Sequence, residues 1–277
     1  MTFPPSDGTA VLEGKAMEPS AEISVQPSAA LRPRRRFLAF HKWDRNFFLG
    51  FLAFCWLGVL MGFVPAAAKR YAGHADYPAP LILKLHAVAF SAWMVLLTAQ
   101  IALIRVRRPQ LHMKLGMIGV GLVPVMAATG FFAEVYSQRY RFAHPPNSQA
   151  FFIIPIYYVI AFSALASAAL AMRKDPPAHK RLILLATSII VGAAYGRWWG
   201  TGLYNLFGDG LLGVLVYTYA GADLILAAAL AYDWRTRGRI HPVYEIAVPA
   251  ILAGQIATSF IYHSPKWLPI AHLAIQH

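Results

Sequence analysis

The sequence has one cysteine, Cys55, and only 12 acidic residues, and each scarcity excludes a class of protein. A single thiol cannot form a disulfide framework or a cysteine-based zinc or iron–sulfur site, because these need two or more thiols. Charged residues make up 13% of the chain, too few for an ordinary soluble domain. The sequence also has no phosphate-binding glycine loop, no serine on a glycine-rich elbow and no His-Glu-x-x-His helix, so it predicts no catalytic residue.

Apolar residues are abundant instead. They make up 58% of the 277 residues, and the mean hydropathy is +0.49. A helix that crosses about 30 Å of hydrocarbon needs roughly 20 apolar residues. Seven segments meet this requirement: 47–68, 81–104, 117–136, 151–172, 182–204, 211–232 and 244–262. The sequence therefore predicts an all-α, polytopic membrane bundle of seven transmembrane helices.

The basic residues predict how this bundle is oriented. Seventeen of the 25 Lys and Arg residues flank one side of the seven segments, and six flank the other side. Because Lys and Arg favour the cytoplasmic side, the N-terminus is predicted to be cytoplasmic. Residues 1–36 are rich in Pro, Ser, Ala and Glu, which predicts a disordered tail before a transmembrane domain over 37–277. The net charge of +13 is thus attributed to contact with the lipid bilayer and not to nucleic acid.

Two turns on the predicted cytoplasmic side share a pattern. Each places a proline three residues before a histidine, and a basic residue and a leucine follow at matching offsets: His112 and Lys114 in one turn, His179 and Arg181 in the other. A looser third copy surrounds His241. The pattern predicts a weak repeat of three helical hairpins after a first helix. For His112 and His179 a ligand role and an unliganded interfacial histidine stay equally open, whereas the unliganded interpretation is favoured for His241.

The second segment carries polar residues on one face. His86, Trp93 and Gln100 follow one another at intervals of seven residues, so they share a helix face, which is expected to point into the bundle. An ionisable side chain at the bilayer centre costs at least about 2.5 kcal/mol, so a buried histidine asks for a reason. His86 is interpreted either as a satisfied core histidine or as a metal or haem ligand.

Three charged residues lie within other segments. Arg197 and Glu134 match in depth near the outer side, which predicts an ion pair between two helix ends or an anion site at Arg197. Asp223 lies near the midplane without a partner at its depth. Its carboxyl group is expected to be protonated, or to accept a hydrogen bond from Tyr, Ser or Gln on a neighbouring helix.

The histidines raise the possibility of a haem site. Haem in a helix bundle needs axial ligands from helices that face each other, apolar walls, and cations for the propionates. His112 and His179 begin their helices at equal depth, and Lys114, Lys180 and Arg181 are near enough to neutralise the propionates. The sequence therefore predicts haem b as the cofactor, with His112 and His179 as the metal ligands.

A second haem ligand set is predicted on the outer side. There His86 would face His263, with Arg197 as the partner of a propionate, although His263 lies closer to the membrane boundary than His86 does. No other cofactor is expected, because the spacings that select copper are missing.

These motifs resemble an uncharacterised bacterial family of multi-span membrane proteins, a domain of unknown function. The likeness covers about residues 81–200. The matching positions are His86, Gln100, His112, Lys114, His179, Arg181 and Arg197. The family is distantly similar in architecture to the bundles of di-haem b-type cytochromes. The family brings no established reaction, so haem-linked electron transfer is predicted from the histidines alone. The expected location is the bacterial inner (plasma) membrane, and the expected partner is a larger membrane or redox complex.

A rival hypothesis belongs to another class. The chain would be a non-catalytic accessory subunit of a membrane complex, or a carrier of a small solute or protons, and its histidines would be structural. Gln100, Glu134, Arg197 and Asp223 would then line a polar path. Colour on purification would favour the haem hypothesis, and colourless protein would favour this one.

Overall fold

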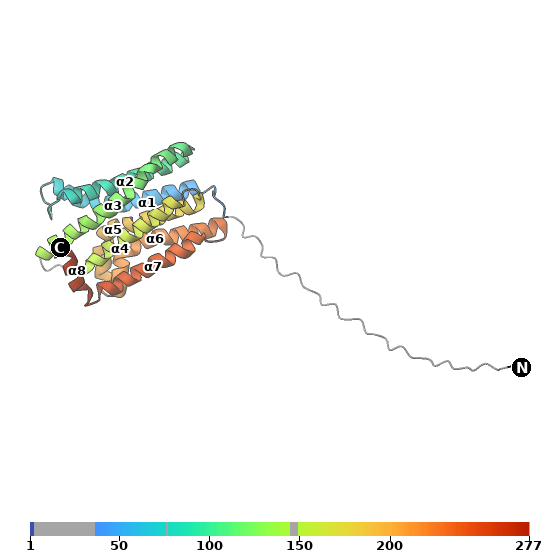
Figure 1. Cartoon of the computed structure of the whole chain (residues 1–277). Coiled ribbons are helices and arrows are strands. Elements are labelled where there is room, and N and C mark those ends of the chain that lie inside the picture. The colour runs from blue at the N-terminus through green and yellow to red at the C-terminus, as the bar shows by residue number, and fades with distance from the viewer. Residues whose placement is uncertain (3–36, 76, 145–148, 277) are drawn as a thin grey trace. The chain divides into compact units, whose positions relative to one another are not determined.

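The computed structural model describes residues 1–2, 37–75, 77–144 and 149–276. The chain divides into two units, Met1–Arg36 and Phe37–His277. The predicted disorder of the tail falls on residues that, apart from 1–2, lie outside the described part. Within the second unit the described residues form a bundle of helices and no strand (Figure 1).

Seven of these helices are long and apolar enough to cross a membrane, which confirms the predicted seven-helix bundle. They are α1 (Asp44–Tyr71), α2 (Leu81–Arg105), α3 (Pro109–Ala143), α4 (Ile153–Ala171, preceded by the 3-10 turn η1, Gln149–Phe152), α5 (Pro176–Phe207), α6 (Leu211–Arg237) and α7 (Pro242–Tyr262). The chain is a multi-pass membrane protein.

The helices α3 and α5 begin earlier than the hydrophobic segments predict, because each has a polar first turn. Their first residues are Pro109 and Pro176. Proline suits the first position of a helix, where its missing N–H would have had no partner. The side chain of Asp175 caps α5 by accepting a hydrogen bond from the Ala178 backbone N–H, at 3.3 Å. This polar first turn places His179 inside the helix.

Helix α5 forms the centre of the bundle. In its most apolar stretch of 18 residues, 67% of the residues are buried, against 22% in the corresponding stretch of α1. It packs on α1, α4 and α6. The contact with α1 depends on glycines, because a Cβ at Gly58 would collide with the Tyr195 ring and one at Gly62 with the Ala194 carbonyl. The Tyr195 hydroxyl donates to the carbonyl of Phe54 at 2.7 Å. The close approach at the two glycines and the Tyr195 hydrogen bond thus hold α1 against α5.

An eighth helix, α8 (Trp267–Gln276), was not predicted. It has 10 residues, too few to cross a membrane, so a search for long apolar segments does not find it. It packs beside η1 and the end of α3, where Phe152, Ala271 and Ile275 form a small second core (Figure 1).

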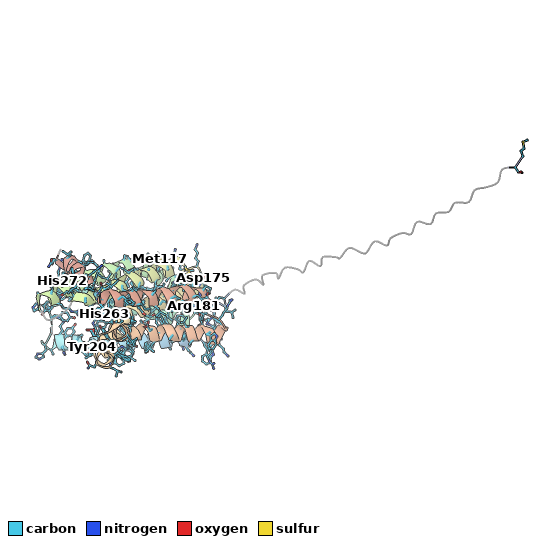
Figure 2. The ribbon with its side chains drawn as sticks, turned by 90° about the horizontal axis from the view of Figure 1, so that it is seen from below. Met117, Asp175, Arg181, Tyr204, His263 and His272 are labelled. Atoms are coloured by element: carbon cyan, nitrogen blue, oxygen red, sulfur yellow. The ribbon has the colours of Figure 1, made fainter. Side chains whose placement is uncertain are left out.

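The two ends of the bundle differ in their side chains. We name as the basic end the one where α1, α3, α5 and α7 begin and α2, α4 and α6 end; α8 lies at the opposite end (Figure 1). Figure 2 shows Asp175 and Arg181 toward the basic end, and Tyr204, His263 and His272 toward the opposite end. The predicted histidine pair His112 and His179 lies at the basic end, whereas Asp223 lies in the middle of α6.

Candidate histidine site and its surroundings

His112 and His179 meet at the basic end. Their ring centroids lie 6.3 Å apart and their planes are nearly perpendicular, at 87°. His112 lies in the first turn of α3 and His179 in the first turn of α5, each three residues after the proline that opens the helix. The repeated turn therefore brings the two imidazoles to one level, as their equal depth predicts.

The hydrogen bonds around this pair are incomplete. His179 Nδ1 lies 2.8 Å from the carbonyl oxygen of Ala169, so Nδ1 donates and Nε2 of the neutral ring has a free lone pair. His112 Nδ1 and Gln100 Oε1 are buried, and neither has a hydrogen-bond partner among the described residues. Each unsatisfied buried polar atom costs about 1–3 kcal/mol. The pair is therefore suited to a bound group that supplies the missing partners.

The spacing of the two rings suits one kind of metal centre. A metal–imidazole bond is about 2 Å long and the ring centre lies about 1 Å further, so imidazoles on opposite sides of one metal have ring centres about 6 Å apart. The observed 6.3 Å fits this arrangement. No group of three or more His, Cys, Asp or Glu side chains that could hold a metal ion occurs in the described part of the chain. Haem iron needs only two axial ligands from the protein, so two histidines suffice for it.

Of the three predicted propionate partners, Lys180 and Arg181 are paired with carboxylates of the protein. Lys114 is exposed and lines a shallow pocket of about 480 Å³ between α2 and α3. Arg181 is buried: its guanidinium donates to both carboxylate oxygens of Asp233, with Nε 2.7 Å from Oδ2, and to the Pro177 carbonyl at 2.8 Å. The charge of Arg181 is thus neutralised within the protein, which leaves Lys114 as the exposed cation of the three.

Asp44 and Asp233 form the ion pairs of the basic end, and neither residue was predicted from the sequence. The Asp44 carboxylate accepts hydrogen bonds from Lys180 Nζ at 2.7 Å, from Arg237 Nη2 at 2.8 Å and from the Tyr232 hydroxyl at 2.6 Å. These contacts join α1, α5 and α6 at the basic end. The available signal was that each of these acids lies within a flank that is otherwise basic.

His241, the third repeated histidine, is structural. Its Nδ1 accepts a hydrogen bond from the Val243 backbone N–H at 3.1 Å and so caps α7, and its ring packs edge-on against Phe37 at 4.6 Å. Burial, together with the nearby Arg181 charge, lowers the pKa of His241 to about 4. The ring is neutral near pH 7, in keeping with the interpretation favoured from its sequence.

At the opposite end, the expected ion pair between Arg197 and Glu134 is not formed. Arg197 Nη1 donates to the Ala193 carbonyl at 3.0 Å, and its guanidinium carbon lies 4.9 Å from the centre of the Phe63 ring. The Glu134 carboxylate accepts from Gln138 Nε2 at 2.5 Å. The two residues lie at one depth, as predicted, but their side chains point in different directions. Each therefore has a partner on its own helix.

His86 and His263 do not form the predicted outer pair. His86 Nδ1 is buried without a hydrogen-bond partner in the described residues, and its ring lies 4.2 Å from Phe90. His263 Nδ1 is 2.7 Å from the Ser259 carbonyl and Nε2 is 2.6 Å from the Asp209 carbonyl. Because carbonyl oxygens only accept, both ring nitrogens donate, and these bonds raise the pKa of His263. His263 is thus a structural tie with no nitrogen left for a metal.

Asp223 has the kind of partner that its sequence predicts. Gln255 Nε2 of α7 donates to Asp223 Oδ1 at 2.8 Å. Nearby, the Tyr219 hydroxyl and Thr258 Oγ1 are hydrogen-bonded at 2.5 Å. Within residues 37–75, 77–144 and 149–276 no hydrogen bond joins Asp223 to Glu134 or to Gln100. In the described residues these polar groups are therefore separate and form no continuous hydrogen-bonded path.

The face shared by His86, Trp93 and Gln100 does point inward. Trp93 is buried, and its indole N–H donates to Thr187 Oγ1 of α5 at 3.1 Å. His86 and Gln100 are half-buried at either side of it along α2.

No family model matches this chain. Comparison with curated proteins finds no match, and neither does comparison with solved structures. The likeness to an uncharacterised bacterial membrane family therefore stays a prediction that depends on its motif residues. The geometry at His112 and His179 is the basis for a functional proposal.

Proposed function

We propose that this membrane protein binds haem b at its basic end, with His112 and His179 as the axial ligands, and carries electrons within the membrane. The observation that supports this is the separation of 6.3 Å between two imidazole centres that come from different helices. The unsatisfied Nδ1 of His112 beside them is a further reason to expect a ligand.

The residues around the pair have distinct roles in this proposal. The bond from His179 Nδ1 to the Ala169 carbonyl fixes the ring and leaves Nε2 for the metal, an arrangement that also makes the imidazole a stronger ligand. Lys114 offers a cation for one propionate. The Gln100 side-chain amide lies beside Gly116, one turn of α3 after His112. Bound haem would supply one-electron chemistry, and the helices would keep water and other reactants away from it.

The proposed location is the bacterial inner membrane with the basic end in the cytoplasm. The support is the excess of Lys and Arg at that end. An electron carrier needs a donor and an acceptor, so we include a larger membrane or redox complex as the partner.

An optical spectrum tests the proposal. The full chain, produced in cells supplied with haem and extracted in mild detergent, should show a Soret band that shifts on reduction. His112→Ala and His179→Ala should each remove or displace the band, whereas His74→Ala, an exposed histidine in the loop after α1, should leave it unchanged. A protein without a Soret band, or a band unchanged in both ligand variants, would overturn the haem assignment.

A second candidate is a proton carrier, favoured by two half-buried carboxyl groups within the membrane-spanning helices, each of which accepts a hydrogen bond from a glutamine. These are Asp223 with Gln255, and Glu134 with Gln138. Asp223→Asn and Glu134→Gln should then abolish proton uptake into vesicles that contain the purified protein. If the protein is coloured and these two variants behave as wild type, the carrier hypothesis loses its support.

A further inference from the structure

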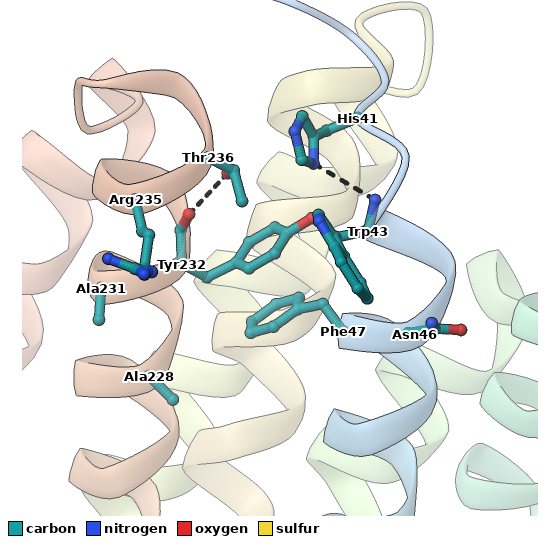
Figure 3. A pocket seen from close by; sticks show the side chains of 9 residues that line it. All are labelled: His41, Trp43, Asn46, Phe47, Ala228, Ala231, Tyr232, Arg235 and Thr236. Carbon is teal, nitrogen blue, oxygen red and sulfur yellow. Dashed lines mark hydrogen bonds between the residues drawn. The ribbon is translucent and has the colours of Figure 1, made fainter.

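A groove between α1 and α6 at the basic end has a polar rim and an apolar floor (Figure 3). Its volume is about 740 Å³. The lining residues are His41, Trp43, Asn46 and Phe47 from the α1 side, and Ala228, Ala231, Tyr232, Arg235 and Thr236 from α6. Because α6 ends at Arg237 and α1 begins at Asp44, the polar side chains lie at the rim and the alanines lie deeper along the helix.

The rim carries a positive charge that the protein does not neutralise. Arg235 is exposed, and no described residue forms an ion pair or hydrogen bond with its side chain. Two carboxylates of the basic end, Asp44 and Asp233, already pair with three other cations. The rim is therefore complementary to an anion.

His41 adds a second donor. The Trp43 backbone N–H donates to His41 Nδ1 at 3.3 Å, so in the neutral ring the proton is on Nε2. An Nε2–H group can donate to an anionic oxygen. The groove thus combines a guanidinium and an imidazole donor on opposite walls, as Figure 3 shows for Arg235 and His41.

The floor of the groove suits a hydrocarbon chain. Ala228 and Ala231 leave room on α6 because their side chains are small. On α1, Gly50 lies on the same face as Phe47 one turn deeper, and nothing stands within 4 Å of the place its Cβ would take. Trp43, which is 54% exposed, and Tyr232 line the groove at the end of the bundle. Tryptophan and tyrosine are typical of membrane–water interfaces.

We infer that this groove is a binding site for one anionic phospholipid, whose phosphate meets Arg235 and His41 and whose acyl chain lies along Ala228, Ala231 and Phe47. A free phosphate would gain the donors at the rim but nothing from the apolar floor. A zwitterionic lipid would bring its own cation to a rim that already carries one. The site is separate from the histidine pair and does not depend on the haem proposal.

Native mass spectrometry of the full chain tests this inference. The protein is released from a neutral detergent and titrated with phosphatidylglycerol or, in parallel, with phosphatidylcholine. One phosphatidylglycerol should bind with an affinity at least about fivefold higher than that of phosphatidylcholine, which corresponds to about 1 kcal/mol for one favourable basic charge. Arg235→Gln should remove this preference. Arg173→Gln, the same change of charge at the same end but outside the groove, should keep it.

Two further measurements separate the possible occupants. Ala231→Leu fills the floor and should weaken phosphatidylglycerol binding several-fold while the rim stays intact. Competition by millimolar inorganic phosphate should be weak for a lipid site and strong for a simple phosphate site. Phosphatidylglycerol brominated on its acyl chains should quench tryptophan fluorescence in the wild type, and Trp43→Phe should remove most of that quenching. Equal binding of the two lipids, equal loss in Arg235→Gln and Arg173→Gln, or full displacement by phosphate would overturn the inference.

Discussion

Lys180 Nζ in α5 lies 2.7 Å from Asp44 Oδ2 in the first turn of α1. The other oxygen of this carboxylate is 2.8 Å from Arg237 Nη2 of α6. One acid thus holds two cations from two other helices, and it also accepts hydrogen bonds from the Tyr232 hydroxyl at 2.6 Å and from the His41 backbone N–H at 3.0 Å. The N-cap residue of α1, Trp43, forms no side-chain hydrogen bond with the helix. The ion pairs of Asp44 therefore fix the start of α1.

Asp44→Asn should destabilise the bundle substantially. Removing one partner from a buried ion pair typically costs about 3–5 kcal/mol, because the remaining charges stay buried and face each other. We expect a loss near the lower limit, about 3 kcal/mol, since the Asp44 side chain keeps some contact with solvent. Denaturant unfolding in detergent measures it. Glu245→Gln, in the exposed first turn of α7, is the matched control and should have almost no effect.

Arg181 and Asp233 should behave as a coupled pair. Both side chains are almost fully buried, at 2% and 1% exposure. Arg181→Met leaves the buried Asp233 carboxylate with Arg237 Nη1, 3.5 Å away, as its remaining cation, and should cost about 3 kcal/mol. The double variant Arg181→Met with Asp233→Leu should recover most of that loss. A double-mutant cycle by chemical unfolding measures the coupling. Additive losses would show that the two groups contribute independently.

The long apolar segments could be predicted because their cause is local. A helix in a bilayer must satisfy its own backbone and present about 20 apolar residues, and both requirements are visible in a single stretch of sequence. The level of His112 and His179 followed from the same reasoning, since depth depends on the position within a segment. Helix α8 was missed because its 10 residues are too few to form a long apolar segment.

Side-chain partners could not be predicted from depth. Arg197 and Glu134 share a level, yet Arg197 bonds to Ala193 of its own helix and Glu134 accepts from Gln138. The rotation of each helix about its axis decides such partners, and that rotation depends on packing across the whole bundle. Arg181 shows the same effect, because its pairing with Asp233 depends on how α5 faces α6.

Gly62→Ala should weaken the contact between α1 and α5. In an open helix the change would stabilise by up to about 1 kcal/mol, because alanine favours the helix more than glycine does. At Gly62, however, the new Cβ would collide with the Ala194 backbone carbonyl, which cannot move as a side-chain end can. Overpacking of this kind costs about 1–3 kcal/mol and should outweigh the gain. Gly121→Ala, in α3 with nothing within 4 Å, should be neutral or stabilising in the same unfolding experiment.

The tie at His263 should make stability depend on pH. Its two hydrogen bonds to carbonyl oxygens favour the protonated ring and raise its pKa in the folded state above the unfolded value of about 6.5. The folded protein then binds more protons than the unfolded chain as the pH rises above 6.5, so the contribution of His263 is complete below that value and is lost as the pH passes through the raised pKa. His263→Gln should remove this loss.

The measurement is the difference in unfolding midpoint between wild type and His263→Gln, followed from about pH 6 to about pH 9, the range around the ordinary histidine pKa. The wild-type advantage should be largest at the acid end and should shrink toward the alkaline end. His74→Gln, a loop histidine at the same end of the bundle, is the control and should show a constant difference from wild type. An advantage of wild type over His263→Gln that grows with pH would contradict the doubly donating ring, because a neutral imidazole would then be the form that the fold prefers.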